Sequence, residues 1–376
     1  MELELTDEQT MLRDTTRRFL EDSMPLSAVR ELAENEPAGF DRAWWRQAAE
    51  LGWTSMLVPE ELGGGSVSGA GLADLAMIAH ERGRLVSPGP LLGTNVVAAA
   101  LAAAGAPGEQ AAVLEGLLAG EVVATWAFAE PNAEWSAAGV ALTATPTAEG
   151  VVLDGVKTTV EAGAEGDQVL VTARTGAGLT QVLVPAGSPG VEVERMESLD
   201  LVRRLAEIRF TGVELPANAV VGEIGGAAAD VERQLQLALV LQCAEIVGAI
   251  DRAFAFTVEW AFDRYSFGRP LASYQALKHR FAEMKLWLEA SHATADAAVR
   301  AVEEAAANAA ELVSVAKSYI GDQAPALLQG CVQMHGGIGV TWEHDLHLYL
   351  RRVTQNALLF GTPEDHRERI VALLGV

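Results

Sequence analysis

Cysteine is scarce in this 376-residue sequence, which contains only Cys243 and Cys331 and no CxxC pair. A disulfide framework or a thiolate zinc site needs several cysteines at short spacing, so neither is predicted, and a reducing cytoplasm suits the chain. The first four residues lack the basic and then apolar run of a secretory leader. The longest uncharged stretch, between Arg84 and Glu109, is rich in alanine and broken by prolines and glycines, so no membrane span is expected.

Positive charge is scarce as well: 27 lysines and arginines face 51 aspartates and glutamates, which gives a formal charge of −24. This balance argues against nucleic acid or an anionic membrane as the main partner, and an anionic ligand must be held by a few local cations. Half of the residues are apolar and 21% are charged, which excludes disorder and leaves an ample core.

The common motifs of several enzyme classes are missing. There is no P-loop, no GxGxxG after a predicted strand, no GxSxG and no HExxH. His344 and His347 flank Asp345, but without a third clustered ligand two histidines at this spacing are more typical of a solvated or interhelical face than of a metal site. No metal is predicted.

The apolar pattern divides the chain into three parts, with domains predicted at residues 1–118, 119–224 and 225–376. In the first part Thr6 is placed to cap a helix, and helical spacing returns over residues 40–57, 71–84 and 95–104. The second part consists of short β-rich runs, in which Asp154-Gly155 is the clearest hairpin signal.

The third part begins after Gly225-Gly226 and is helical. Residues 231–262 contain one glycine and no proline and are apolar on nearly every face, which predicts a buried helix at the centre of a bundle. Further helices are expected over residues 273–303, 307–334 and 343–359. The sequence therefore predicts an α+β fold with an N-terminal helical domain, a middle β domain and a C-terminal four-helix bundle.

Four separated motifs resemble one known family. The stretches RYSFGRPLASYQALKHRFAEM (264–284) and QMHGGIGVTWEHDLHLYLRR (333–352) look like the C-terminal domain of the acyl-CoA dehydrogenases. ELGWTSMLVPEELGGG (50–65) and RRLAEIRFTGVELPANAVVG (203–222) are similar to the family's first and middle domains. The resemblance implies an FAD enzyme that removes hydrogens from Cα and Cβ of an acyl-CoA thioester, with a carboxylate base at Cα and flavin N5 as hydride acceptor.

In that family each FAD lies across a subunit interface: one subunit holds the flavin ring, and its neighbour contacts the adenosine pyrophosphate. The resemblance implies that this chain has the residues of the neighbour. Guanidinium, hydroxyl and glycine backbone groups suit pyrophosphate oxygens. The residues that match the family's cofactor contacts are Arg264, Ser266, Phe267, Gln275, Gln333, Gly336, Gly337 and Thr362.

The family's residues around its own flavin ring are largely absent here. Ala129 stands where the family has a hydroxyl residue, and Trp135 stands where it has a serine. The flavin-stacking tryptophan falls at Thr159 and the hydrogen-bonding threonine at Glu161, whose charge would oppose the anion that develops on a reduced flavin. The indole of Trp135 would also crowd the substrate channel.

The catalytic glutamate is absent as well. Its usual position, before Gly361-Thr362, is occupied by Phe360, and the alternative position on the first bundle helix is occupied by Ala238. Glu245 lies about 10 Å further along that helix and is expected to be out of reach. Glu364 and Asp365 remain as fallback candidates for a relocated base.

This chain keeps the residues that contact the FAD of a neighbouring subunit but lacks those that would bind a flavin ring of its own. In this it resembles the non-catalytic subunit of the α2β2 acyl-CoA dehydrogenases of actinobacteria, several of which act on CoA thioesters of sterol side chains. The predicted partners are a second family subunit that carries the glutamate, an acyl-CoA substrate and an electron-acceptor flavoprotein. Two alternatives stay open: a self-sufficient homotetramer that uses Glu364 or Asp365, and a flavin-free acyl-CoA-binding scaffold.

Overall fold

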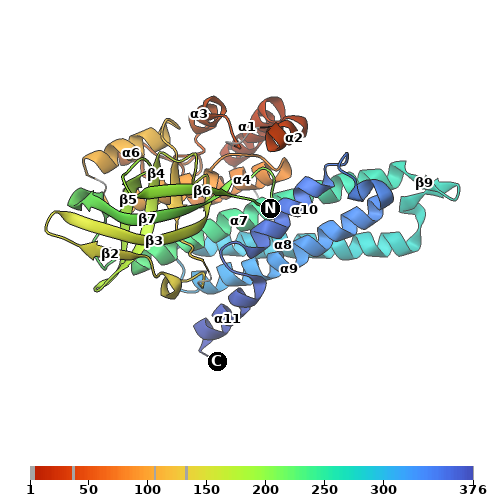
Figure 1. Cartoon of the computed structure of the whole chain (residues 1–376). Coiled ribbons are helices and arrows are strands. Elements are labelled where there is room, and N and C mark those ends of the chain that lie inside the picture. Colours follow the sequence, from red (N-terminus) through yellow and green to blue (C-terminus); the bar gives the residue numbers. More distant parts are fainter. Residues whose placement is uncertain (1–4, 36–38, 106, 132–133, 376) are drawn as a thin grey trace.

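The computed structural model describes residues 5–35, 39–105, 107–131 and 134–375. The first four residues, on which the expectation of no secretory leader rests, lie outside this part. Figure 1 shows the N-terminal helices and the sheet at one end of the molecule, with long helices extending away from them. Within the described residues no helix combines the length and apolarity that crossing a membrane requires.

The N-terminal part is helical, as predicted. Thr6 and Gln9 form a reciprocal capping box at the start of the first helix, and the side chain of Asp41 accepts a hydrogen bond from the Trp44 amide at the start of the third, at 2.7 Å. The helices are α1 (Asp7–Ser23), α2 (Leu26–Asn35), α3 (Arg42–Glu50), α4 (Gly71–Arg84), α5 (Leu91–Ala103) and α6 (Glu109–Leu118).

The helix predicted over residues 40–57 is shorter than expected. It ends at Glu50, and residues 51–57 form turns instead. Gly52 has φ +86°, a left-handed conformation that stops helix propagation, so the apolar spacing beyond it continues without a helix.

The middle part is a sheet in the order β6-β7-β3-β2-β4-β5-β8, with β1 parallel to β4. Alternate side chains of these strands form a second apolar core within the sheet, separate from the larger core that joins the N-terminal helices to the bundle. The strands are β1 (Ala124–Ala127), β2 (Thr143–Pro146), β3 (Gly150–Glu161), β4 (Gln168–Thr175), β5 (Gly178–Pro185), β6 (Val191–Met196), β7 (Leu205–Pro216) and β8 (Val220–Val221).

The hairpin predicted at Asp154-Gly155 is wrong. These residues lie inside β3, where the register against β7 shifts between Leu153 and Gly155. Gly155 has φ +143°, and a Cβ there would lie 2.8 Å from Cγ of Leu142. The register pairs Leu153 with Val213 and Gly155 with Phe210, so the extra residue of this β-bulge is on β7, at Thr211-Gly212, and the Asp-Gly pair lies opposite it.

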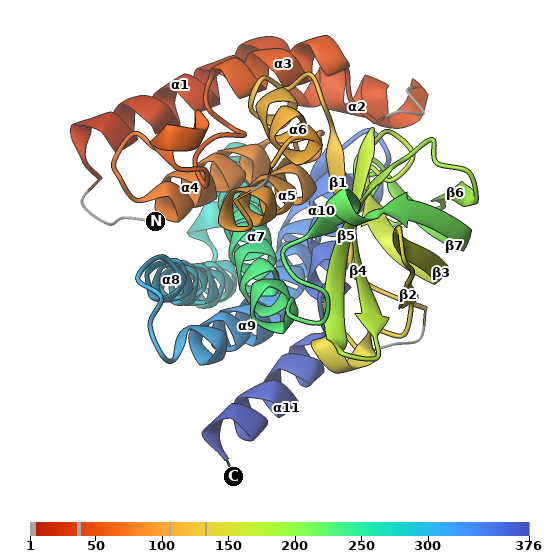
Figure 2. The same ribbon diagram turned by 90° about the vertical axis from the view of Figure 1, so that its left-hand side faces the viewer.

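The C-terminal part is a bundle of α7 (Ala228–Asp263), α8 (Gln275–Glu303), α9 (Ala309–His335) and α10 (Leu346–Leu358), followed by α11 (Pro363–Leu374). Figure 2 looks along the bundle and shows α7 between the N-terminal helices and α9. Residues 237–250 in the middle of α7 are buried on every face, as predicted, whereas its two ends are partly exposed. The hairpin of β9 (Tyr265–Ser266) and β10 (Arg269–Pro270) lies at the end of the bundle far from the sheet (Figure 1).

The predicted α+β class with its three parts is thus confirmed. The boundaries after residues 118 and 224 stay a prediction.

Candidate functional site

The residues at the predicted ring pocket form a cluster of aromatic side chains. Trp126 stacks on Phe128 and on Phe360, with ring centroids 5.2 and 5.7 Å apart, and Trp135 meets the edge of Phe360 at 5.3 Å. The cavity between them has a volume of about 20 Å³, room for about one water molecule. This cavity is also lined by Ala129, Thr159 and Glu161 and has no room for a tricyclic ring.

The segment that carries Phe360 is held from two sides. Buried Lys317 donates a hydrogen bond to the carbonyl of Leu359 at 2.8 Å and others to the carbonyl of Asn356 and to Oε1 of Gln242. His366 lies within hydrogen-bond distance of the Phe360 carbonyl, at 2.9 Å from Nε2. Phe360 itself has φ +62°, a conformation that bulky side chains rarely adopt unless the surroundings impose it.

Replacing Phe360 by alanine is expected to lower the free energy of unfolding of the isolated chain by about 2 kcal/mol, less than the loss of a fully buried phenylalanine because this ring is half-buried. Chemical denaturation measures the change. Leu358→Ala, two residues earlier and exposed, is the control and should cost less than about 0.5 kcal/mol. Equal costs would contradict the packing described for Phe360.

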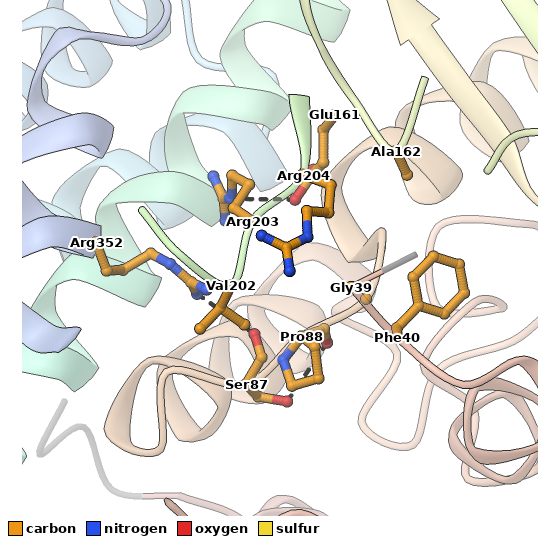
Figure 3. A pocket seen from close by; sticks show the side chains of 11 residues that line it. Gly39, Phe40, Ser87, Pro88, Glu161, Ala162, Val202, Arg203, Arg204 and Arg352 are labelled. Carbon is orange, nitrogen blue, oxygen red and sulfur yellow. Dashed lines mark hydrogen bonds and ion pairs between the residues drawn. The ribbon is translucent and has the colours of Figure 1, made fainter. Parts of the chain in front are cut away.

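The negative charge of Glu161 is compensated by an arginine. This corrects the expectation from the sequence that the charge would oppose the anion of a reduced flavin. Its carboxylate lies 3.1 Å from Nε of Arg203, and Figure 3 shows the two side chains facing each other beside Arg352. What opposes a flavin ring here is the filled space rather than the charge of Glu161.

Arg203 also belongs to a buried network that the sequence reasoning missed. Its guanidinium contacts Glu245 at 2.5 Å and Oδ1 of Asn356 at 2.9 Å. Arg352 pairs with Asp200 and, at 2.7 Å, with Glu245. Glu245 is thus fixed by two arginines and by the Asn356 amide, so it has no lone carboxylate oxygen to act as a base.

The network changes how Glu245 titrates. Burial alone would raise the pKa of Glu245, but Arg203 and Arg352 outweigh burial and lower the pKa to about 2 from the usual 4.5. A carboxyl group whose pKa is lower in the folded state stabilises the fold above its unfolded pKa, and this stabilisation is lost as the pH falls.

Glu245→Gln is therefore expected to remove a stabilisation that is full above about pH 5 and fades as the pH falls toward 2. Unfolding free energies of both proteins between these limits provide the test. The difference between them should shrink as the pH falls, and a difference that stays constant would contradict the pairing.

The two fallback residues lie at the surface near the start of α11. Glu364 is 72% exposed and pairs with Arg367. The carboxylate of Asp365 accepts hydrogen bonds from the amide and hydroxyl of Thr362, both at 2.8 Å. Neither lines the cavity beside Phe360, and Ala238 is buried in the apolar core.

Seven of the eight predicted cofactor contacts fall into two neighbouring groups, and the eighth, Thr362, lies apart from them. Arg264, Ser266, Phe267 and Gln275 lie on or beside the β9–β10 hairpin, and Gln333, Gly336 and Gly337 lie at the end of α9. The ring of Trp260 joins the two groups: the Arg264 guanidinium lies 5.9 Å from its centroid, and the His335 ring stacks on it at 5.2 Å. Thr362 is elsewhere, at the start of α11, where its side chain caps that helix.

The turn of this hairpin presents an aromatic side chain to solvent. Phe267 and Gly268 have φ +49° and +80°, as in a two-residue type I′ turn, and Phe267 is 97% exposed. Arg264, Gln275, Gln333, Gly336 and Gly337 are exposed as well. We call the seven residues on the hairpin and at the end of α9, without Thr362, the bundle-end set.

A helical part, a β sheet and a helical bundle in this order define the architecture of an acyl-CoA dehydrogenase. The structure of butyryl-CoA dehydrogenase from Megasphaera elsdenii has this fold, with a TM-score of 0.90 at 23% identity over 100% of both chains. Residues 6–121 match the N-terminal domain of that family and residues 226–374 match its C-terminal domain.

The chain belongs to the acyl-CoA dehydrogenase family. It is 32% identical over 367 residues to acyl-CoA dehydrogenase IpdE2 of Mycobacterium tuberculosis, covering 97% of this chain and 96% of that one. The ChsE4–ChsE5 complex of the same organism contains a chain of TM-score 0.89 and 27% identity, with coverage of 100% and 99%. A Tcur3481–Tcur3483 steroid acyl-CoA dehydrogenase has TM-score 0.87 and 28% identity, with coverage of 98% of both chains.

FAD, the cofactor of this family, fits the two regions of the chain differently. The cavity beside Phe360 is too small for the flavin ring. The bundle-end set offers an arginine, amide and hydroxyl donors and glycine backbone, the donor set that suits a pyrophosphate.

Proposed function

We propose that this chain is a non-catalytic subunit of an FAD-dependent acyl-CoA dehydrogenase and completes the FAD site of a second family subunit. The observation that carries the proposal is the contrast between its two regions. Trp126, Trp135 and Phe360 fill the pocket for its own flavin ring, whereas the bundle-end set is exposed except for half-buried Ser266.

The surface around the bundle-end set supports contact with another subunit. Large apolar side chains are exposed on the hairpin, at the end of α7 and just after α9, as is common where another protein binds. They are Phe262, Tyr265, Phe267, Ile338, Val340 and Trp342. In a chain of charge −24, Arg264 also provides local positive charge for a pyrophosphate.

In the proposed complex the partner supplies the glutamate, the ring contacts and most of the acyl pocket. FAD held there would supply the hydride acceptor for Cβ of the thioester. This chain contributes by holding the polar end of FAD and by keeping its own ring pocket closed. An electron-acceptor flavoprotein is the proposed oxidant of the complex.

The relatives support two chains and a sterol substrate. ChsE4–ChsE5 is a complex of two named components, and the Tcur3481–Tcur3483 protein is described as a steroid acyl-CoA dehydrogenase. We infer that the substrate is an acyl-CoA thioester and that CoA esters of sterol side chains are the first to test.

The experiment is co-purification with a second family member that has an intact glutamate, followed by turnover of acyl-CoA thioesters with an electron acceptor. Changing the partner's glutamate to glutamine should abolish turnover, whereas E364Q combined with D365N in this chain should not. The opposite pattern would favour the self-sufficient homotetramer. Thioester binding without flavin in any complex would favour the scaffold.

A further inference from the structure

Three side chains from three helices meet in a place that the flavin site does not use. His80 of α4, Asp251 of α7 and His292 of α8 lie with their potential ligand atoms within 4.8 Å of one another. Nε2 of His80 is 2.8 Å from one carboxylate oxygen of Asp251, and Nε2 of His292 is 3.0 Å from the other. All three side chains are largely buried.

Two imidazoles and one carboxylate form a common ligand set of divalent transition metals, with further positions left for water. Metal–ligand bonds of about 2.0–2.2 Å place neighbouring ligand atoms a little over 3 Å apart, close to the two nitrogen–oxygen distances of 2.8 and 3.0 Å within a set that spans up to 4.8 Å. A cavity of about 220 Å³ borders all three residues and leaves room for water ligands.

A carboxylate stands behind one of the imidazoles. Nδ1 of His80 lies 3.5 Å from Glu81, and Glu81 is fixed by Arg17 through hydrogen bonds of 2.8 and 2.9 Å. Metal-binding histidines usually direct their second ring nitrogen at such a carboxylate, which fixes the ring and strengthens it as a ligand.

The positive side chains around the cavity have carboxylate partners of their own. Arg13 pairs with Asp14, Arg17 and Arg84 pair with Glu81, and Lys285 pairs with Glu289. Asp251 instead receives the two imidazoles. A cation bound among the three side chains would therefore take the place of the protons in these two hydrogen bonds.

The cluster is separate from both flavin regions. Asp251 is 13 residues from Ala238 and 13 from Arg264 along the same helix, about 20 Å in each direction. It joins α4 of the N-terminal part to α7 and α8 of the bundle, so an ion here would tie the two parts together.

We propose that His80, Asp251 and His292 bind one divalent transition-metal ion per chain, with Zn²⁺ as the ion that fits best. The site is independent of the proposed function, because it does not involve FAD or a partner subunit. Its role is to stabilise the packing of the N-terminal helices on the bundle.

Cobalt titration of the chelator-treated full chain tests this site, because Co²⁺ bound by nitrogen and oxygen ligands has a visible absorption spectrum. Saturation is expected at about one Co²⁺ per chain, with loss of the spectrum on adding an equal amount of Zn²⁺. The unfolding midpoint should rise with Zn²⁺ concentration. Excess Mg²⁺ should not compete, which separates this site from the many surface carboxylates.

His292→Gln removes a ligand but keeps an amide that can donate to Asp251, so the variant should fold. Its affinity for Co²⁺ should fall by at least about tenfold, the cost of even an indirect change around a metal. His279→Gln, at an exposed position of the same helix, is the matched control and should bind as the wild type does. Absence of the spectrum in the wild type, an unchanged His292→Gln, or equal losses in both variants would overturn the proposal.

Discussion

Arg264→Ala is expected to weaken the affinity of the two-subunit complex for FAD about 10- to 100-fold. This is the change expected from the loss of one charge-assisted hydrogen bond to phosphate. The guanidinium is exposed at the end of the bundle and lies against Trp260, which holds it beside the end of α9. The measurement is FAD retained by the purified complex at increasing dilution. Arg264→Lys should recover only part of the affinity, because an ammonium group lacks the planar pair of donors.

Arg269→Ala is the matched control for this prediction. It removes the same charge five residues away, but Arg269 is outside the bundle-end set and its guanidinium stacks closely on Tyr274, at 3.8 Å against 5.9 Å for Arg264 and Trp260. FAD retention should be close to that of the unchanged complex. Equal losses in the two variants would mean that only net charge matters, and no loss in Arg264→Ala would remove this residue from the site.

Arg352→Ala is expected to lower the free energy of unfolding by about 3–5 kcal/mol, the cost of breaking a buried ion pair from one side. The side chain is 1% exposed and pairs with Asp200 and Glu245. Its removal leaves two buried carboxylates with fewer partners. Denaturant titration of the isolated chain measures the change, with circular dichroism to confirm that the variant folds.

Arg367→Ala is the control for Arg352→Ala, because Arg367 also pairs with two carboxylates, those of Asp322 and Glu364. Its side chain is 46% exposed, so water takes the place of the lost contacts. We expect a cost of less than about 1 kcal/mol. Similar costs for the two arginines would contradict the distinction between a buried and an exposed network.

Much of the fold was predictable because long helices and alternating strands leave strong patterns. The proline-free helical pattern of residues 231–262 became α7, with its ends within three residues of the prediction. The errors occurred where one local signal has two structural outcomes. Gly52 ended a helix that apolar spacing would have continued, and Asp154-Gly155 lies within a strand, opposite a bulge of β7, instead of in a turn.

The candidate site was predictable only in part. Matching residues to family positions identified Phe360, Trp135 and the bundle-end set, but it could not show that the aromatic rings close the cavity. Glu245 carried a usable signal, since it is the only charged residue between Arg233 and Asp251 in a buried stretch of helix, and a buried carboxylate must have a partner. Its partners, Arg203 and Arg352, are distant in sequence, so only the folded chain brings them to it.

The central claim is that the bundle-end set of this chain contacts the FAD of a partner subunit, and that the chain has no room for a flavin ring of its own. Visible flavin absorbance per chain, measured on the protein expressed alone and after co-expression with a second family member, tests it most directly. The account predicts almost no flavin on the chain alone and about one FAD per two chains in the complex. About one FAD per chain in the protein expressed alone would contradict it.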